Sequence, residues 1–325
     1  MSVDNSVLLC GSSLVYDCHL KEINAYQDFN SEKEFLDEEV AQRLVRLFEY
    51  ENGDLEMNFA TTPRIIAEVY GEITPLNLTH PYNWFHFLID SLPSFLDCLL
   101  KGKINRDTIV VSGVLNINMT RALKVIFNDR LNMLQIDLMK GVKSKKTIVT
   151  KNSFQCKELQ NGDINQNFKF NKHNIINLRN IFDAKLNFQN TTTRSLKLFI
   201  IRLSDQRNVV NIRELIAIAE SMNYRILQPE RHSFDDQVTL FSNSTKIVGS
   251  SGAWLANLLF VNKDCEVSVL YPITAKMENS IWGGLGKLLD VPVTDYYFED
   301  IVRNERQPVH SDFTVDINKF KLILM

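Results

Sequence analysis

The chain has 325 residues, more than a single compact core usually takes, so two domains are expected. Hydrophobic residues make up 45% and charged residues 23%, a composition that excludes a disordered or fibrous protein. The formal net charge of -3 argues against nucleic-acid binding, which needs a dense basic face. A lysine-rich run between residues 140 and 151 is interpreted as a solvated loop.

The five cysteines are scattered, and no two of them have the spacing of a zinc site or a redox pair. Neither a disulfide framework nor a structural metal is therefore expected, as is typical of a reducing compartment. The early apolar run Val7–Cys10 lacks the basic leader and the length of a signal peptide, and no apolar stretch approaches the roughly 20 residues that span a bilayer. These features predict a cytoplasmic protein without a transmembrane segment. They leave peripheral contact with the inner face of a membrane open.

The N-terminal half shows an irregular alternation of helices and strands. Residues 82–100 are expected to form a long helix that is interrupted near Pro93. A strand at 108–111, a helix at 118–127 and a strand at 133–138 follow. This order predicts an α/β domain.

A shift in composition separates the two halves. Residues 155–193 are rich in Asn, Gln and Lys, and the stretch 187–194 has the composition of a linker. We therefore expect an N-terminal domain over residues 1–190 and a C-terminal domain over residues 191–325.

The C-terminal half alternates more regularly. Its predicted strands are 198–201, 224–227, 246–249, 266–270 and 293–297. Its predicted helices are 212–222 with Asn211 as N-cap, 233–241, 253–260 and 278–289. This alternation predicts a parallel, Rossmann-like sheet. Two such α/β domains would place a cleft between the carboxyl edges of their sheets, where ligands bind.

The turn after the third of these strands, Gly249–Ala253, consists of small residues that precede a predicted helix. Such a turn lets a ligand approach the backbone and points free N–H groups at it, an arrangement that suits a diphosphate. A tight turn that only packs helix against sheet would have the same composition.

Two arginines, Arg202 and Arg207, follow the first strand of the C-terminal half, at the edge where that turn lies. Their guanidinium groups could neutralise a diphosphate without a metal, or they could form surface salt bridges. Glu230 follows the second strand. Its carboxylate could accept hydrogen bonds from ribose hydroxyls, or it could be an exposed loop acid.

In the N-terminal half, His86 and Asp90 are four residues apart on the predicted helix, so their side chains can meet. Such a pair could deprotonate an acceptor hydroxyl. A satisfied histidine with a purely structural role is the alternative.

Taken together and in order, these segments resemble the family 61 glycosyltransferases, which include O-linked N-acetylglucosaminyltransferases, plant xylan-decorating enzymes and bacterial polysaccharide enzymes. The family's N-terminal motif is similar to Asn-x-aromatic-His-x-x-x-Asp followed by Leu-Pro. Its C-terminal motifs are Arg-x-x-x-x-Arg, Asn at the next helix, Pro-Glu, Ser-Phe-x-x-Gln and Gly-x-x-Gly-Ala-x-Leu-x-Asn. The matching residues are Asn83, Phe85, His86, Asp90, Leu92, Pro93, Arg202, Arg207, Asn211, Pro229, Glu230, Ser233, Phe234, Gln237, Gly249, Gly252, Ala253, Leu255 and Asn257.

The resemblance implies a GT-B-like fold with two Rossmann-like domains, and metal-independent, inverting transfer from a nucleotide sugar to a hydroxyl of a glycan or glycoconjugate. A UDP-sugar is the expected donor, no further cofactor is expected, and surface polysaccharide synthesis would suit a cytoplasmic enzyme. Asp90 is the favoured base, with His86 as helper or alternative, and Asn83 lies on the acceptor side. The expected nucleotide-sugar-binding residues are Arg202, Arg207, Glu230, Gln237, Ser250, Ser251, Gly252, Ala253 and Asn257.

The chain departs from the family pattern at Ser251, where a histidine is usual, and at Trp254, where a glycine is usual. A hydroxyl can donate to a phosphate but cannot carry charge as an imidazole can. This departure motivates a second hypothesis, an inactive binding or scaffold subunit of a glycosylation complex. Another two-domain transferase or an epimerase of nucleotide sugars is a third. The sequence indicates neither the sugar, the linkage nor the oligomeric state.

Overall fold

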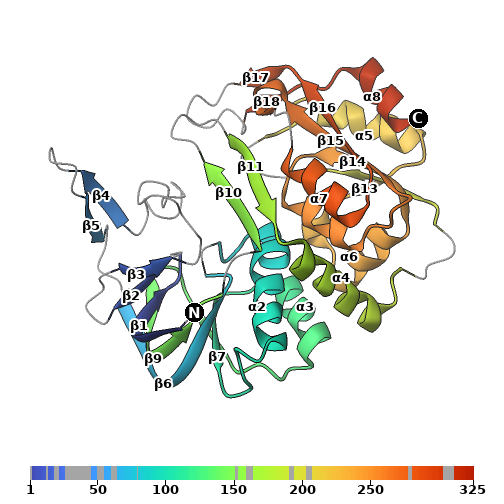
Figure 1. Ribbon diagram of the computed structural model, residues 1–325. Helices are drawn as coiled ribbons and strands as arrows, with labels where there is room; N and C mark the ends of the chain where they lie inside the picture. Colours follow the sequence, from blue (N-terminus) through green and yellow to red (C-terminus); the bar gives the residue numbers. More distant parts are fainter. Residues whose placement is uncertain are drawn as a thin grey trace. The chain divides into compact units, whose positions relative to one another are not determined.

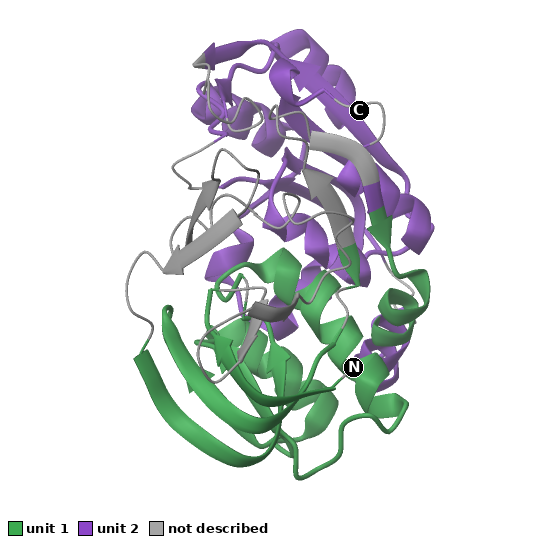
Figure 2. Cartoon of the chain, turned by 60° about the vertical axis from the view of Figure 1, so that its left-hand side comes forward, with its two compact units in different colours: residues 1–158, 169–178 green, residues 159–168, 179–325 purple. Residues whose placement is uncertain are grey.

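The computed structural model describes residues 2–11, 14–17, 22–25, 45–49, 55–59, 64–78, 80–150, 153–158, 164–189, 194–202, 207–276, 280–302 and 311–325 (Figure 1). The chain divides into two compact units, which Figure 2 colours separately. Unit 1 comprises residues 1–158 and 169–178, and unit 2 comprises residues 159–168 and 179–325. The domain boundary near residue 190 rests on composition and stays a prediction. Residues 190–193 of the predicted linker lie outside the described residues.

Unit 1 is built around a mixed seven-stranded sheet with the strand order β3-β2-β1-β9-β6-β7-β8. The strands β9, β6, β7 and β8 run parallel, whereas β1 pairs antiparallel with β2 and β9, and β2 pairs antiparallel with β3. The N-terminal half is therefore α/β, as predicted, but its sheet is only partly parallel. The strands are β1 (Ser2–Leu9), β2 (Leu14–Asp17), β3 (Glu22–Ala25), β6 (Arg64–Leu76), β7 (Ile109–Gly113), β8 (Met133–Ile136) and β9 (Lys140–Ile148), and outside this sheet lie β4 (Val45–Glu49), β5 (Leu55–Phe59) and β10 (Phe154–Glu158). The strand β11 (Ile164–Phe170) belongs to unit 2 up to residue 168 and to unit 1 after it.

A continuous helical run begins at Trp84 and ends at Leu100, and it contains a π-helical turn. The π-helix η2 spans His86–Ser91 and passes directly into α2 (Leu92–Leu100). The N–H of Leu92 bonds to the carbonyl of Phe87, five residues earlier. Pro93 has no N–H, and its ring would clash with a carbonyl four residues before it. The helix therefore widens ahead of Pro93 instead of stopping there, so the predicted interruption takes the form of a π turn.

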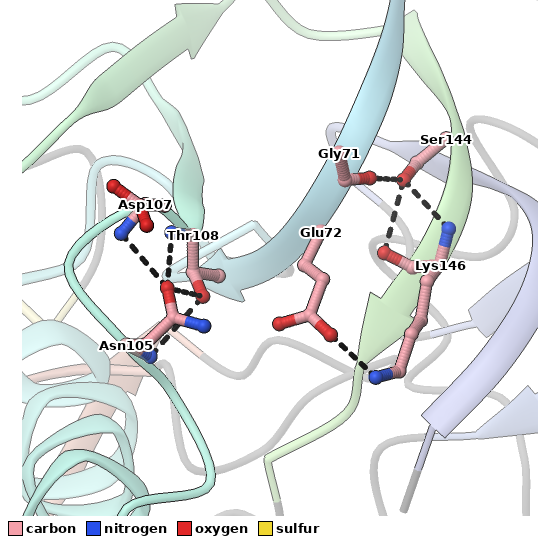
Figure 3. A network of polar contacts seen from close by, with 7 residues as sticks. All are labelled: Gly71, Glu72, Asn105, Asp107, Thr108, Ser144 and Lys146. Carbon is pink, nitrogen blue, oxygen red and sulfur yellow. Dashed lines mark hydrogen bonds and ion pairs between the residues drawn. The ribbon is translucent and has the colours of Figure 1, made fainter.

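Figure 3 shows how unit 1 accommodates a register shift between the parallel strands β6 and β9. The buried Ser144 donates its hydroxyl to the carbonyl of Gly71 at 3.0 Å and accepts the N–H of Lys146 at 3.0 Å. The side chain of Lys146 pairs with Glu72 on the neighbouring strand. These bonds satisfy backbone groups that the bulge removes from the ladder.

Two asparagines close turns around β7. The side chain of Asn105 accepts the N–H groups of Asp107 at 2.8 Å and Thr108 at 3.1 Å, just before the strand (Figure 3). After the strand, Asn116 caps α3 (Ile117–Phe127) by accepting the N–H groups at the start of the helix at 3.0 Å. The predicted strand–helix–strand order of this region is confirmed.

Unit 2 contains a five-stranded sheet in which every paired strand is parallel. Its order is β13-β12-β14-β15-β16, which is 2-1-3-4-5 in chain order. The order reverses between β12 and β14, and ligands of doubly wound sheets bind at such a switch point. The strands are β12 (Leu196–Ile200), β13 (Arg225–Leu227), β14 (Ser244–Ser250), β15 (Glu266–Pro272) and β16 (Val293–Phe298), which confirm the predicted strands; β17 (Asp300–Val302) and β18 (Asp312–Phe313) form a separate pair.

Helices cover both faces of this sheet (Figure 1). Helices α5 and α8 pack on one face, against a core that includes Phe199, Val248 and Leu270. On the other face, Phe260 lies between Phe182 and Phe234, with ring centroids 5.5 Å and 5.6 Å away. The helices are α5 (Ile212–Ser221), α6 (Phe234–Ser242), α7 (Ile281–Leu289), α8 (Ile317–Leu324) and the 3-10 helices η3 (Pro229–Arg231), η4 (Ala253–Phe260) and η5 (Ile273–Ala275), together with α4 (Lys172–Leu186), which belongs to unit 2 from residue 179 on.

Several details differ from the sequence expectations. The lysine-rich run at residues 140–151, interpreted as a solvated loop, contains strand β9, which lies between β1 and β6 in the sheet. Asn211 stands at the N-cap of α5 but forms no capping bond, because its amide is paired with the backbone of Val315 at 2.9 Å and 3.1 Å. The predicted helix 253–260 is a 3-10 helix. Helix α4 lies inside the polar region 155–193, where no helix was predicted. Within the described residues, no helix is long and apolar enough to cross a membrane.

Candidate anion site and candidate base

The carbonyl ends of β12 and β14 bring Arg202 against the small-residue turn of unit 2. Arg202 Nη1 donates to the carbonyl oxygen of Ser251 at 2.6 Å. Gly252 makes room for this side chain, because an added Cβ would lie 3.1 Å from Arg202 Nη1. The guanidinium of Arg202 therefore contacts the turn Gly249–Ala253, which the sequence indicates as a candidate phosphate site.

Arg207 contacts the same turn. In the chain it follows residues 203–206, which lie outside the described residues. Its Nη1 donates to Ser251 Oγ at 3.3 Å, and its Nε is buried without a hydrogen-bond partner. Burial first, and then the like charge of Arg202, lower the pKa of Arg207 from its ordinary value to about 10. Two cations therefore share a poorly solvated corner, an arrangement that favours an anion.

Trp282 completes this corner and was missed by sequence reasoning. It lies in the first turn of α7 and donates its indole N–H to Ser251 Oγ at 3.2 Å. The N-cap of α7 is Ser280, whose hydroxyl accepts the N–H of Gly283 at 2.8 Å. Ser251 is therefore held by three donors: two reach its hydroxyl and one its carbonyl. An N-cap serine followed closely by an aromatic residue was the available signal.

Glu230 is exposed in the short turn η3 that follows β13. Burial lowers the pKa of Arg202, and the charge of Glu230 acts on it in the opposite direction. The acid expected at this sheet edge thus belongs to the same neighbourhood as the arginines.

Gln237 and Asn257 are not directed at the arginine corner in this structure. Both are buried, and Asn257 Nδ2 donates to Gln237 Oε1 at 2.9 Å. Gln237 Nε2 in turn donates to the carbonyl of His232 at 3.1 Å. This hydrogen bond joins α6 to η4, the helix that follows the turn, so the pair stabilises the structure next to the turn.

The backbone of the turn is partly engaged already. The N–H of Ser251 donates to the carbonyl of Leu270 at 3.0 Å, and the carbonyl of Ser250 accepts the indole N–H of Trp254 at 2.7 Å. Trp254 stands where the family that the sequence resembles usually has glycine. Its hydrogen bond to Ser250 therefore stabilises the turn. Ala253 opens η4 just after the extended Gly252.

Two glycine substitutions are expected to separate packing from binding in this turn. A Cβ on Gly249 would lie 2.7 Å from Ile200 Cβ and 3.0 Å from Trp254 Cζ2, so Gly249→Ala is expected to destabilise the protein by about 1–3 kcal/mol. Gly252→Ala presses only on the Arg202 side chain, so it is expected to cost less than about 1 kcal/mol but to weaken anion binding. Thermal unfolding and pyrophosphate titration measure the two effects. Equal losses of stability in Gly249→Ala and Gly252→Ala would contradict this separation of packing from binding.

In unit 1, Asn83, His86 and Asp90 occupy the start of the helical run. Asn83 Oδ1 accepts the N–H of Phe85 at 2.9 Å, which shapes the helix start. His86 Nδ1 lies 3.4 Å from Asp90 Oδ2, so the imidazole and the carboxylate meet as expected. His80, which sequence reasoning did not single out, stacks on His86 with ring centroids 3.8 Å apart.

Asp90 also fixes the chain that enters β10. Its Oδ1 accepts the N–H of Phe154 at 3.2 Å, and its carbonyl accepts the N–H of Ser153 at 3.2 Å. The side chain of Asp90 is 5% exposed, whereas that of His86 is 22% exposed. His86 is therefore the more accessible end of the pair.

The fold and these groups define an α/β protein with two arginines held against one turn at the switch point of a parallel sheet. Residues 84–268, more than half of the chain, match the model of the family described as Glycosyltransferase 61. The chain belongs to this glycosyltransferase family, whose members act between a sugar donor and an acceptor. A search of curated proteins found no match.

Proposed function

We propose that the chain is a metal-independent, inverting glycosyltransferase of the GT-B type. In this proposal a nucleotide sugar, with a UDP-sugar as the expected donor, gives its sugar to a hydroxyl of a glycan or glycoconjugate in polysaccharide synthesis. The observation that supports it best is the pair Arg202 and Arg207, held against one turn at the switch point of unit 2. Family membership supplies the reaction class.

The charges of the arginine corner explain why a diphosphate suits it. Poorly solvated like charges raise the energy of the folded protein unless an anion offsets them. Within the described residues, Arg207 has no ion-pair partner, and its Nε is left without an acceptor. The oxygens of a diphosphate provide both the charge and the acceptors, and guanidinium groups match them in bidentate geometry.

The transfer step is a single displacement. The acceptor oxygen forms a bond to the anomeric carbon while the bond from that carbon to the diphosphate oxygen breaks, so the configuration inverts. The electron pair leaves with the diphosphate, where Arg202 and Arg207 stabilise the charge that develops. Asp90 takes the acceptor proton, aided by His86, whose Nδ1 lies 3.4 Å from Asp90 Oδ2.

Inorganic pyrophosphate is expected to raise the Tm of the ligand-free protein, because it binds the arginines only when the chain is folded. At about 100 times its Kd, it adds about 2.7 kcal/mol to the free energy of unfolding. Sodium chloride at equal ionic strength is the control for charge screening. A screen of UDP-, GDP-, CMP- and TDP-sugars for hydrolysis then identifies the donor. A Tm that responds to none of these anions would overturn the proposal.

A second candidate is an inactive binding or scaffold subunit. The feature that favours it is Ser251, which stands where the family usually has histidine and whose hydroxyl already accepts bonds from Arg207 and Trp282. Calorimetry with a nucleotide panel separates the two candidates. Binding with donor hydrolysis supports the transferase, whereas the absence of any nucleotide binding supports the scaffold.

A further inference from the structure

A buried tyrosine beside the arginine corner has a hydroxyl without a partner. Tyr271 lies at the end of β15, directly after Leu270, whose carbonyl holds the N–H of Ser251. Only 5% of Tyr271 is exposed, and its Oη forms no hydrogen bond in the described part of the chain. Tyr271 is also close enough to Arg207 to influence the pKa of that guanidinium.

Two further polar groups face this hydroxyl. Asp295 lies on β16, two residues before Tyr297, which is paired with Tyr271 across the sheet, so both side chains share one face. Ser280 is buried at the start of α7. Both groups lie near enough to Tyr271 to influence its pKa through side-chain hydrogen bonding, but neither bond reaches full hydrogen-bond geometry at Tyr271 Oη. Asp295 Oδ1 is likewise buried without a partner.

Unpaired buried polar atoms are rare in folded proteins, and each one needs an explanation. Here Arg207 Nε, Tyr271 Oη and Asp295 Oδ1 are all unpaired. Tyr271 lies near the carboxyl end of β15, and Asp295 lies on β16 two residues before the residue that pairs with Tyr271. The three unpaired atoms comprise two donors and one acceptor. A ligand that continues from a diphosphate and carries neighbouring hydroxyl groups would satisfy all three.

We propose that Tyr271, Asp295 and Ser280 form a subsite that binds the hydroxyls of a sugar ring next to the diphosphate. This inference rests on the proposed function and adds residues to it that lie beyond residue 268, where the family match ends. Asp295 accepts a hydrogen bond from a sugar hydroxyl, Tyr271 donates one to a ring or hydroxyl oxygen, and Ser280 offers a second hydroxyl beside them. The ring is either the ribose of the nucleotide or the transferred sugar.

The pKa shifts of Tyr271 and Asp295 agree with their roles as hydrogen-bond donor and acceptor. Burial, followed by the charge of Asp295, raises the pKa of Tyr271 well above its ordinary value, so the phenol keeps its proton as a donor. Burial also raises the pKa of Asp295, while contacts with Ser280 and Tyr271 oppose the rise. Hydroxyl groups of a ligand would oppose it further, because they donate to the carboxylate.

Tyr271→Phe is the most direct test, because it removes only the unpaired hydroxyl. The Tm of the ligand-free variant is expected to stay near that of the wild type, since no hydrogen bond of full geometry is lost. Its affinity for the sugar-bearing ligand is expected to fall about tenfold, or about 1.4 kcal/mol. Asp295→Asn is expected to lower the affinity for the same ligand. The affinity for inorganic pyrophosphate is expected to stay unchanged in both variants.

Tyr224→Phe is the matched control, because this buried tyrosine donates its hydroxyl to the carbonyl of Leu324 at 2.8 Å. It is expected to lower the Tm and leave every ligand affinity unchanged. UDP, GDP, CDP and dTDP are compared with their sugar conjugates. Loss of affinity for the nucleoside diphosphates assigns the subsite to ribose, and loss confined to the conjugates assigns it to the transferred sugar.

Wild-type affinity for all these ligands in Tyr271→Phe and Asp295→Asn, with a lowered Tm, would overturn the subsite and leave the proposed function intact. A wild-type protein that binds neither pyrophosphate nor any nucleotide would overturn the proposed function, and the subsite with it.

Discussion

Replacing Arg207 with glutamine is expected to abolish the stabilisation by pyrophosphate and to reduce transfer at least about 30-fold, which corresponds to a loss of about 2 kcal/mol or more. The glutamine keeps much of the side-chain length but removes the charge and the fork that would hold a diphosphate. The ligand-free variant is expected to be at least as stable as the wild type, because Arg207 is poorly solvated, lies beside Arg202 and has an unpaired Nε. Isothermal titration, enzyme assays and thermal unfolding measure the three quantities.

Arg213→Gln is the matched control for this experiment. Arg213 is exposed on α5, in the same unit, so it tests the general effect of removing one positive charge. It is expected to leave binding and turnover near wild type. Arg207→Lys keeps the charge without the planar fork, and an intermediate affinity is expected. Wild-type turnover in Arg207→Gln would show that the arginine corner does not hold the leaving group.

Asp90→Asn is expected to lower kcat by about 10²–10⁴-fold, because the amide cannot take the acceptor proton. Donor binding is expected to stay near wild type, since the proposal gives Asp90 no contact with the nucleotide. The fold is expected to survive, because the amide oxygen can still accept the N–H of Phe154 that Oδ1 accepts at 3.2 Å. Asp90→Ala loses that bond as well and is expected to be less stable than Asp90→Asn.

Asp97→Asn provides the comparison on the same helical run. Asp97 pairs with Lys101 at 2.7 Å near the surface of α2, and such pairs contribute about 0.3–0.5 kcal/mol. Both stability and kcat are expected to stay near wild type. If Asp90→Asn also keeps its turnover, Asp90 only ties β10 to the helix, and His86 becomes the remaining candidate base.

The strands of unit 2 were predictable because parallel strands covered on both faces are continuous apolar runs in the sequence. The runs around Leu198, Ile247 and Val267 are such strands, and all three residues are buried. The antiparallel strands β2 and β3 are short and carry no such signal, and β1 pairs with β9, which is distant in sequence. Helix α4 escaped prediction because its apolar stripe of Ile175, Leu178 and Phe182 lies among polar residues.

The candidate site was predictable only in part, for a related reason. Arg202, Arg207 and Ser251 follow strand ends whose alignment a parallel sheet dictates, so their proximity could be expected. Trp282 lies 31 residues after Ser251 in the chain, and its contact with Ser251 depends on how α7 packs. Tyr271 shows nothing unusual in sequence, because an unpaired hydroxyl is a property of its surroundings alone.

Because of the π turn ahead of Pro93, the number of residues in this segment affects the pair His86 and Asp90. A π turn holds one residue more than the α-helical turn it replaces. Deleting one residue between His86 and Asp90 would let a regular α-helix form and would leave the flanking segments nearly in register, because the π turn already holds one extra residue. The spacing of the pair would fall from four residues to three, so the 3.4 Å contact between His86 Nδ1 and Asp90 Oδ2 would change although neither side chain had been altered. A change in residue count is thus expected to act on this pair without unfolding α2.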